Sequence, residues 1–490
     1  MMNDGQIAAV VTKVLAELGS PAKTPQSAPS VPAQNVAAGS VAETAASALS
    51  GRGSSSDGLF DSVDEAVEAA VLAQKQLIGM TLEQRKEIIA SMRKAVLENN
   101  RKLAELAVSE TKLGRVEDKI RENILCACKT PGVEDIQTTA LSGDDGLMLL
   151  EYAPMGVIGA LTPITNPTGT LINNSIGMIA AGNSVVFNPH PNARQTSAAV
   201  VQVIHKAIVD AGGPAGLVAL VRVPTLDTAK ELIEHPKVIM LVATGGKPVV
   251  RVVLSSGKKA IGAGAGNPPV LVDETANIRR AAQCIVDGAS VNNNIFCICE
   301  KEAIIVEEVY ETLIKFMQET GKAYLLTAEE ADRVTKLVVK DGKINAPYIG
   351  KDVQIILRDA GIQVNDACRL AIFRAQPDHP LVWKEQMMPV LPLVCVKDFD
   401  AAVEFAVKVE GGNRHTAVMH STNVEHMTRF ARAIQTTIFV KNAPCYAGIG
   451  LGGEGHTSFT IAGPTGEGLT SARSFTRQRR CTLVESFRII

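Results

Sequence analysis

The sequence predicts an α/β protein built from two doubly wound domains. Between residues 157 and 272, short runs rich in β-branched residues alternate with helical segments, which is typical of a parallel sheet covered by helices. A second alternation of the same kind follows Cys297. The composition agrees, because 46% of the 490 residues are hydrophobic and only 4% are aromatic, so aliphatic side chains must fill the core.

The charge balance argues against nucleic-acid and membrane partners. Lys and Arg number 49 against 51 Asp and Glu, which gives a net charge of -2 and a pI of about 6.5. Such a chain offers no general attraction to a phosphate backbone or an anionic bilayer. No run approaches the ~18 consecutive apolar residues that span a membrane. The nine cysteines and the lack of a secretory leader predict a disulfide-free, soluble, cytoplasmic protein.

Residues 1–18 have the pattern of an amphipathic helix, which Asp4 can cap and Gly19 can end. The apolar stripe consists of Ile7, Val10, Val11, Val14, Leu15 and Leu18. Residues 19–58 are rich in Ala, Ser, Pro and Gly and contain no aromatic side chain, which predicts a flexible linker. Because an isolated helix of about four turns is marginal in water, we expect residues 1–18 to bind a partner surface. The alternative is docking on the body or a sister subunit, and the long linker argues against it.

The globular part begins near Asp61 with helical periodicity at residues 65–80, 82–98 and 102–112. The strands expected in the first alternation are 157–165, 184–188, 217–223, 238–243 and 269–272. The second alternation gives strands at 303–306 and 391–396 and helices at 309–320 and 401–409. Ligands on such sheets bind at the carboxyl ends of the strands, and three of these ends carry TPITNP, NPHP and ATGGKP. The first domain is therefore predicted to bind a dinucleotide.

Cys297 is the candidate nucleophile. A buried cysteine is usually a small hydrophobic residue, but Cys297 follows three asparagines in a polar loop, which is where catalytic thiols lie. Cys297 and Cys299 have the spacing of a metal pair. No second Cys or His pair stands near them at a zinc-like spacing, and the doublet of Cys126 and Cys128 has a helical context, so we expect no metal site.

Asn166 follows a predicted strand and precedes Pro167. An asparagine before proline is most often a turn or cap residue. A side-chain amide at the carboxyl end of a central strand is also where a donor to an oxyanion is wanted, so both interpretations stay open.

The glycine clusters at 262–266 and 448–455 match neither the Walker A pattern nor the dinucleotide fingerprint, and they favour tight turns. His190, His415 and His456 stand beside predicted loops. Scattered histidines of this kind favour structural or solvated roles.

Several segments, taken in order, resemble the aldehyde dehydrogenase superfamily and, within it, the CoA-acylating branch. They are TNPTGTLINNSIGMIAAGNSVVFNPHP (165–191), LVATGG (241–246), GAGAGNPPVLVDETA (262–276), NNNIFCICEKEAI (292–304), EQMMPVLPLV (385–394), GGNRHTAVMHS (411–421) and the tail from 442 to 481. The resemblance spans about residues 60–490 and is greatest to propionaldehyde and acetaldehyde dehydrogenases of bacterial microcompartments. It implies that residues 1–18 bind a shell or cargo protein inside such a compartment in the cytoplasm.

The resemblance implies a mechanism for the site. Cys297 would attack the aldehyde carbonyl, while the Asn166 amide and the Cys297 backbone N–H hold the oxyanion. Hydride would pass to NAD, and the thiol of coenzyme A would take the acyl group. Hydrolytic relatives carry a glutamate in an ELGG motif that activates water, and its place falls near Ala263 in a segment without a carboxylate. Without that base, attack by water loses about 10²–10⁴-fold, which favours a thiol acceptor.

The resemblance also implies the binding residues. The cofactor set is Thr162, Pro163, Ile164, Asn188, His190, Thr244, Gly245, Gly246 and Glu385, of which Thr244 to Gly246 face the phosphates and Glu385 the nicotinamide ribose. Asn188 replaces the lysine of the KPSE motif. An uncharged residue offers little to a 2′-phosphate, but this departure leaves the choice between NAD and NADP open. His190 is assigned to the nucleotide or CoA. Ile295 and Phe296 would form the wall of the aldehyde pocket.

The same comparison divides the chain into a dinucleotide-binding domain at 59–269, a catalytic domain at 270–462 and a C-terminal return at 463–490. An arm near 140–152 would join subunits into a dimer or tetramer by exchanging strands with the C-terminal residues. Two other hypotheses remain at this point. One is a hydrolytic aldehyde dehydrogenase that yields free acid, and the other is a non-catalytic cargo or scaffold protein that keeps the fold.

Overall fold

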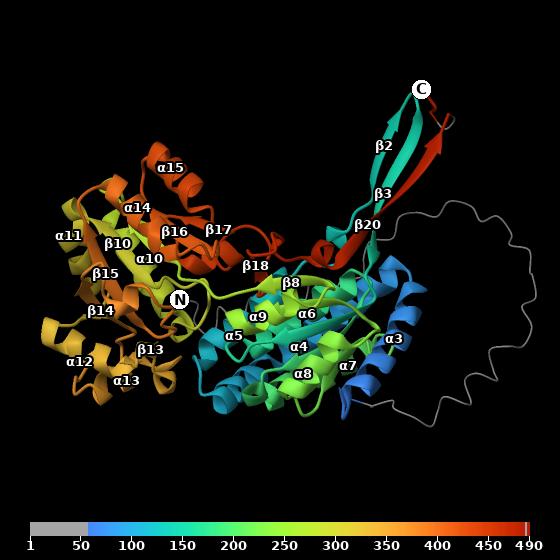
Figure 1. Ribbon diagram of the computed structural model, residues 1–490, viewed down its shortest axis with the longest axis horizontal. Helices are drawn as coiled ribbons and strands as arrows, with labels where there is room; N and C mark the ends of the chain where they lie inside the picture. Colours follow the sequence, from blue (N-terminus) through green and yellow to red (C-terminus); the bar gives the residue numbers. More distant parts are fainter. Residues whose placement is uncertain (1–56, 486–487) are drawn as a thin grey trace, which may run out of the picture.

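The computed structural model describes residues 57–485 and 488–490 (Figure 1). The predicted helix at 1–18 lies outside the described residues, as does the predicted linker except for its last two positions. Among the helices of the described part, none is both long enough and apolar enough to cross a bilayer.

The first domain is built on a six-stranded sheet with the order β1-β6-β5-β4-β7-β8, in which every neighbouring pair is parallel. Its strands are β1 (Leu59–Phe60), β4 (Val157–Thr162), β5 (Ser184–Pro189), β6 (Val218–Val221), β7 (Val238–Thr244) and β8 (Lys259–Ala263). The four longer predicted strands are present. The sequence did not reveal β1, which has two residues, or β8, whose KAIGA sequence lacks a β-branched run.

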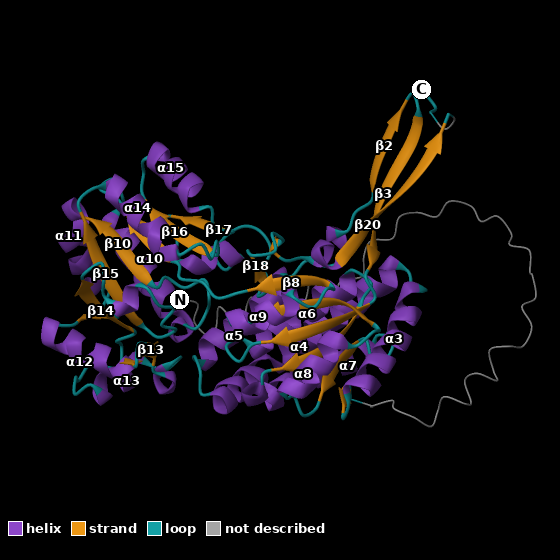
Figure 2. Ribbon diagram, in the orientation of Figure 1, coloured by secondary structure: helices purple, strands orange, loops and turns teal. Residues whose placement is uncertain are grey.

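Helices cover both faces of this sheet (Figure 2). They are α3 (Val63–Ile78), α4 (Leu82–Thr111), α5 (Val116–Lys129), α6 (Pro167–Ala180), α7 (Arg194–Asp210), α8 (Leu226–Glu234) and α9 (Lys247–Leu254). Alternate residues of β5 pack into different cores, with Val185 and Phe187 in the core beneath α4, α6 and α7 and Val186 in the core beneath α3 and α8. This period of two is that of a strand buried on both faces, so the domain is doubly wound as predicted.

One predicted helix boundary is wrong. Residues 82–98 and 102–112 were expected to form separate helices, but α4 is continuous through both. Two asparagines lie at the expected break between the two helices, and the side chains of both form hydrogen bonds inside the protein. Asn99 donates to the carbonyl of Ala95 at 2.9 Å, and the buried Asn100 donates to the carbonyl of Ile120 in α5 at 3.2 Å. These bonds satisfy the amides without ending the helix.

The second domain contains a seven-stranded parallel sheet with the order β11-β14-β15-β10-β9-β16-β17. Its strands are β9 (Pro269–Val272), β10 (Glu302–Val306), β11 (Ala323–Leu325), β14 (Leu370–Ala375), β15 (Val390–Val396), β16 (Thr416–His420) and β17 (Ile438–Lys441). Its helices are α10 (Ile278–Ser290), α11 (Glu307–Glu319), α12 (Ala328–Val338), α13 (Val353–Asp359), α14 (Phe399–Glu410) and α15 (Val424–Ile434). The assignment of 269–272 to the first alternation is wrong, since β9 pairs with β10 and β16. Periodicity predicts a strand but not the sheet that it joins.

A three-stranded antiparallel arm projects from the body (Figure 1). It contains β2 (Thr139–Gly143), β3 (Gly146–Pro154) and β20 (Thr476–Val484), with β20 paired to β3 of the same chain. Two small antiparallel pairs complete the sheets of the described residues, namely β12 (Val339–Lys340) with β13 (Lys343–Ile344), and β18 (Ile461–Ala462) with β19 (Gly468–Leu469).

Candidate active site

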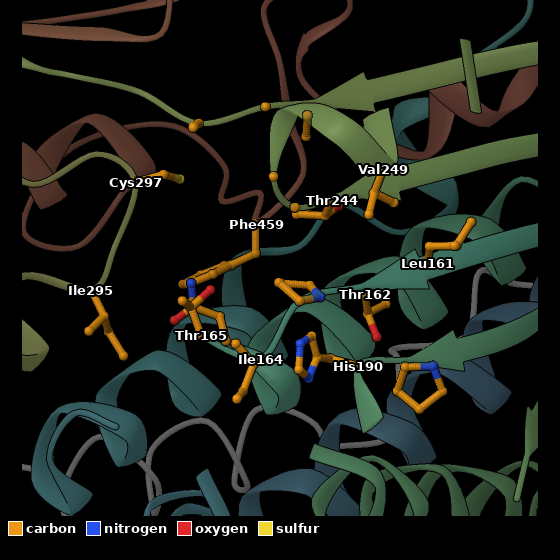
Figure 3. Close-up of a pocket in the computed structure, with 18 of the residues that line it drawn as sticks. Leu161, Thr162, Ile164, Thr165, His190, Thr244, Val249, Ile295, Cys297 and Phe459 are labelled. Carbon is orange, nitrogen blue, oxygen red and sulfur yellow. The ribbon is translucent and has the colours of Figure 1, made fainter. Parts of the chain in front are cut away.

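A cavity of about 680 Å³ lies where the ends of β4, β5 and β7 face the loop that carries Cys297 (Figure 3). Figure 3 shows the Cys297 side chain directed into this space, with Ile295 on the same side and Thr162, Leu161 and Val249 across from them. Every residue that the sequence nominated lines the cavity. They are Thr162, Pro163, Ile164, Asn166, Asn188, His190, Thr244, Gly245, Gly246, Ile295, Phe296, Cys297 and Glu385.

The three asparagines before Cys297 shape its loop. Asn292, Asn293 and Asn294 have φ values of 47°, 54° and 62°, in the left-handed region that asparagine tolerates better than other residues with a side chain. Their side chains then fix the turn. The Asn292 carbonyl oxygen accepts from the N–H of Arg115 at 2.9 Å, and the Asn294 amide donates to the carbonyls of Ala289 and Glu300 at 2.8 and 2.9 Å. Polar side chains thus hold the loop that carries Cys297.

Lys301 stabilises the same loop through hydrogen bonds to its backbone. Its buried ammonium donates to the carbonyl of Asn294 at 2.8 Å and to that of Phe296 at 3.3 Å. Burial raises the pKa of the Cys297 thiol to about 12, and the carboxylate of Glu385 adds to the increase, whereas Lys301 opposes it. Because the thiolate is the nucleophile, the site in this state keeps Cys297 largely in its unreactive form.

Asn166 occupies the N-cap position of α6, directly after β4, but its side chain makes no capping hydrogen bond. Its Oδ1 instead accepts a bond from the ammonium of Lys119 at 3.1 Å. Asn166 is therefore a cap residue by position, as one of the two interpretations has it, but its side chain is not used for capping. Asn166 is 7% exposed and lines the same cavity as Cys297.

The side of the cavity opposite Cys297 suits a dinucleotide. Gly246 is the N-cap of α9 and makes no side-chain cap. Pro248 has no N–H, so the first turn of this helix offers an anion the N–H groups of Lys247 and Val249. A Cβ at Gly245 would meet no atom within 4 Å, which leaves room for a phosphate close to the backbone. Asn188 accepts a hydrogen bond from the Thr228 hydroxyl at 2.8 Å. Among the described residues that line the cavity, none is Lys or Arg, and Glu385 is the one carboxylate.

Aromatic and aliphatic side chains close the space near Cys297. The rings of Phe296 and Phe459 pack edge to face with centroids 5.8 Å apart, and both are buried. Ile295 and Ile449 are buried beside them. This wall is apolar and leaves room for a small hydrophobic group.

His415 is a site residue that the sequence interpretation missed. It was assigned a structural or solvated role, but it lines the cavity from the position directly before β16. Burial lowers its pKa to about 4, so the ring is neutral at pH 7. Its Nδ1 lies 2.9 Å from the Thr416 hydroxyl, and Nε2 has no partner among the described residues. A neutral imidazole with a free ring nitrogen can accept a proton, but a pKa of about 4 makes His415 a weak base in this state.

The segment around Ala263 contains no carboxylate, as its sequence shows, and it lies at the cavity. Ala263, Gly264 and Ala265 line the cavity, and none can activate water. Gly266 donates its N–H to the carboxylate of Glu385, whose pKa is raised by burial and lowered by Lys301 and by this bond. The carboxylate in the cavity is thus already engaged by the backbone.

Known proteins resemble this chain over most of its length. The profile of the aldehyde dehydrogenase family matches residues 53–346. An acetaldehyde dehydrogenase (acetylating) of Escherichia coli is 48% identical over 440 residues, which cover 88% of this chain and 94% of that protein. Two solved structures have a TM-score of 0.87. One is the Rhodopseudomonas palustris propionaldehyde dehydrogenase with bound CoA and an acylated cysteine, 49% identical and covering 88% of this chain and 99% of that one.

The other is a propionaldehyde dehydrogenase from the Clostridium phytofermentans fucose utilisation bacterial microcompartment, 50% identical and covering 88% of this chain and 100% of that one. These relatives share the two-domain fold and span nearly their whole length in the alignment. Since the family profile also covers more than half of the chain, the protein belongs to the aldehyde dehydrogenase family.

Proposed function

We propose that the protein oxidises a short-chain aldehyde, propionaldehyde or acetaldehyde, and transfers the acyl group to coenzyme A. The observation that carries this proposal is the shared cavity of Cys297, Asn166 and His415, in which the residues around Ala263 provide no base for water. The names of the relatives support the same reaction class. The apolar wall of Phe296, Phe459 and Ile295 suits a substrate of two or three carbons.

In the first half of the reaction, the Cys297 thiol gives up its proton to solvent, and the resulting thiolate sulfur bonds to the aldehyde carbon. The carbonyl electron pair moves onto oxygen, where the Asn166 amide and the Cys297 backbone N–H donate to it. Lys301 favours the thiolate, since it is the positive group that lowers the Cys297 pKa. NAD, when bound, supplies the hydride acceptor. Return of the oxygen electron pair to carbon expels hydride and leaves a thioester on Cys297.

In the second half, His415 accepts the proton of the CoA thiol. The CoA sulfur then attacks the thioester carbon, and Cys297 leaves as a thiolate. His415 offers a free acceptor, since its Nε2 is unpartnered among the described residues. Because burial lowers its pKa to about 4, the transfer requires that the bound ligands raise this pKa. One thioester replaces another, so the oxidation energy is retained in acyl-CoA.

Gly245, Gly246 and the start of α9 would hold the pyrophosphate, Glu385 the nicotinamide ribose, and Asn188 with His190 the adenosine side. None of the described residues that line the cavity is Lys or Arg, which favours NAD over NADP, since a 2′-phosphate is normally met by a cation.

We further infer a homo-oligomer, because the arm projects from the body and its two outer strands, β2 and β20, are largely exposed. A microcompartment location is supported by the relative from a fucose utilisation microcompartment. Residues 1–18 would bind the shell or another cargo protein. If deleting residues 1–18 leaves co-expressed shells loaded with enzyme, that role is wrong.

The reaction is tested by incubating the purified protein with NAD and propionaldehyde, with and without CoA, while NADH and acyl products are followed. We expect sustained NADH formation only with CoA, and propionyl-CoA as the product. Cys297→Ala should abolish NADH formation, whereas Cys395→Ala, at an exposed cysteine on β15, should leave it unchanged. Activity that survives in Cys297→Ala would overturn the assignment of the nucleophile.

A further inference from the structure

We propose that Lys119 is a positioning residue that sets the orientation of the Asn166 amide, so that its N–H groups face the cavity. This inference rests on the proposed oxyanion role of Asn166. Lys119 belongs to α5, 47 residues before Asn166 in the chain, and its side chain is completely buried.

The ammonium of Lys119 has three acceptors and three protons to give. It donates to the carbonyl of Thr165 at 2.6 Å, to Oε2 of Glu122 at 2.9 Å and to Oδ1 of Asn166 at 3.1 Å. An ammonium has no further donor and no acceptor. Lys119 therefore cannot itself bind a substrate oxygen, and it acts only through its three partners.

The chemistry of a lysine fixes the amide. Because an ammonium only donates, the atom of Asn166 that faces it must be the carbonyl oxygen. The NH₂ group then points away from Lys119 and is left for another acceptor. The positive charge of the Lys119 ammonium, next to Oδ1, also polarises the Asn166 amide. This strengthens the amide N–H groups as donors to a developing oxyanion.

Glu122 holds the other side of the same turn. Its Oε1 accepts from the N–H of Gly169 in the first turn of α6 at 3.2 Å. A Cβ at Gly169 would lie 2.3 Å from that oxygen, so the helix start and the carboxylate are in direct contact. Burial raises the pKa of Glu122 and the neighbouring Lys119 lowers it. The ion pair therefore clamps residues 165–169 from both sides of Asn166.

The Lys119 ammonium also lies 5.8 Å from the centroid of the Phe296 ring, next to Cys297 in the chain. Lys119 thus bonds to the segment of Asn166 and lies near the segment of Cys297, the two segments that would provide the oxyanion donors. Burying two charges costs desolvation energy that the pairing barely recovers, so fold stability is a poor explanation for it. Precise placement of Asn166 is a better one.

The test is a double-mutant cycle between Lys119→Met and Asn166→Ala. Loss of an oxyanion donor costs about 10²–10³-fold in kcat, which we expect for Asn166→Ala. Lys119→Met should lower kcat by about 10–10²-fold, since the amide is retained but is free to turn. The KM for NAD should stay near that of the wild type, because the cofactor residues are untouched.

In the Asn166→Ala background, Lys119→Met should cost less than about threefold, because coupled residues are not additive. If the two effects multiply, or if Lys119→Met alone is silent, the positioning role is refuted. If Asn166→Ala itself is silent, the proposed oxyanion role is the claim that fails.

Two further variants separate function from folding. Lys119→Met leaves Glu122 buried without its partner, so the pair Lys119→Met with Glu122→Gln removes both charges together. This double variant should fold and should show the same loss of kcat as Lys119→Met alone. Lys129→Met is the matched control, since this lysine lies on the same helix and donates to the carbonyls of Gly450 and Gly453 instead. Its kcat should match the wild type, and a loss equal to that of Lys119→Met would contradict the proposal.

Discussion

The ring of His415 lies directly against Gly266. A Cβ at Gly266 would be 2.9 Å from Cγ of His415 and 3.0 Å from the carbonyl oxygen of Cys297, closer than such contacts normally come. The proposed base and the nucleophile's loop therefore meet across a residue without a side chain. Gly266 also donates its N–H to Glu385, so this one backbone position touches three cavity residues.

Gly266→Ala should reduce kcat by about tenfold or more, because a displacement of about 1 Å at a reacting group can cost 10²-fold. The methyl group must push on the His415 ring, on the Cys297 loop or on both. Steady-state kinetics measures the loss, and thermal unfolding shows whether the protein remains folded. Gly143→Ala serves as the control, since a Cβ there meets no atom within 4 Å. Wild-type kinetics in Gly266→Ala would show that the contact does not constrain the site.

His415→Asn should separate the two halves of the reaction. The first turnover of NADH should persist, since Cys297 and Asn166 are intact. The rate of acyl transfer to CoA should fall by about 10²–10⁴-fold, the usual value of a general base. Rapid mixing measures both phases. His456→Asn, at an exposed histidine, is the control. Equal slowing of the first turnover would place His415 in aldehyde oxidation instead.

Alkylation of Cys297 should depend steeply on pH in the protein without cofactor. Its pKa is raised to about 12, so below that pH the thiolate fraction, and with it the rate, increases about tenfold per pH unit. Iodoacetamide labelling of Cys297 between pH 7 and 10, read by mass spectrometry, should show no plateau. A plateau near pH 8 would mean that the thiol is not desolvated.

Glu385→Gln should speed the same alkylation several-fold at fixed pH. The carboxylate of Glu385 raises the Cys297 pKa, so its neutralisation lowers that pKa and increases the thiolate fraction. Glu308→Gln, on the exposed surface of α11, should leave the rate unchanged. Slower alkylation in Glu385→Gln would contradict this charge relationship.

NAD should be preferred over NADP by at least about tenfold in kcat/KM. No described residue that lines the cavity is Lys or Arg, and the Asn188 oxygen is engaged by Thr228. Asn188→Lys should lower the ratio of kcat/KM for NAD to kcat/KM for NADP, because it adds a cation where the adenosine ribose would bind. Equal use of both cofactors by the wild type would show that an uncharged site accepts the 2′-phosphate.

The sequence could predict those parts of the site that parallel strands bring together. Asn166, Asn188 and Thr244 all stand at or just after the carboxyl ends of strands in one sheet, so their convergence follows from the alternation of strands and helices. The same reasoning placed β9 in the wrong sheet. A strand pattern carries no information on where the chain crosses between domains.

Lys119 and His415 could not be found in this way. Lys119 reaches Asn166 from a helix that no strand pattern links to the site, and the pattern around it is that of an ordinary charged helix. His415 gains its chemistry from burial and from the partner of its Nδ1, and neither is visible in local sequence. The roles of such residues depend on tertiary contacts, which local sequence does not reveal.

The fate of the acyl group on Cys297 distinguishes transfer to coenzyme A from hydrolysis by water. The protein would be mixed with excess NAD and propionaldehyde without CoA, and NADH, free propionate and the mass of the Cys297 peptide would be followed over time. We expect about one equivalent of NADH and a persistent acyl group on Cys297, released as propionyl-CoA once CoA is added. Many equivalents of NADH with accumulating propionate, before any CoA is present, would show that water is activated in this cavity and would contradict the account.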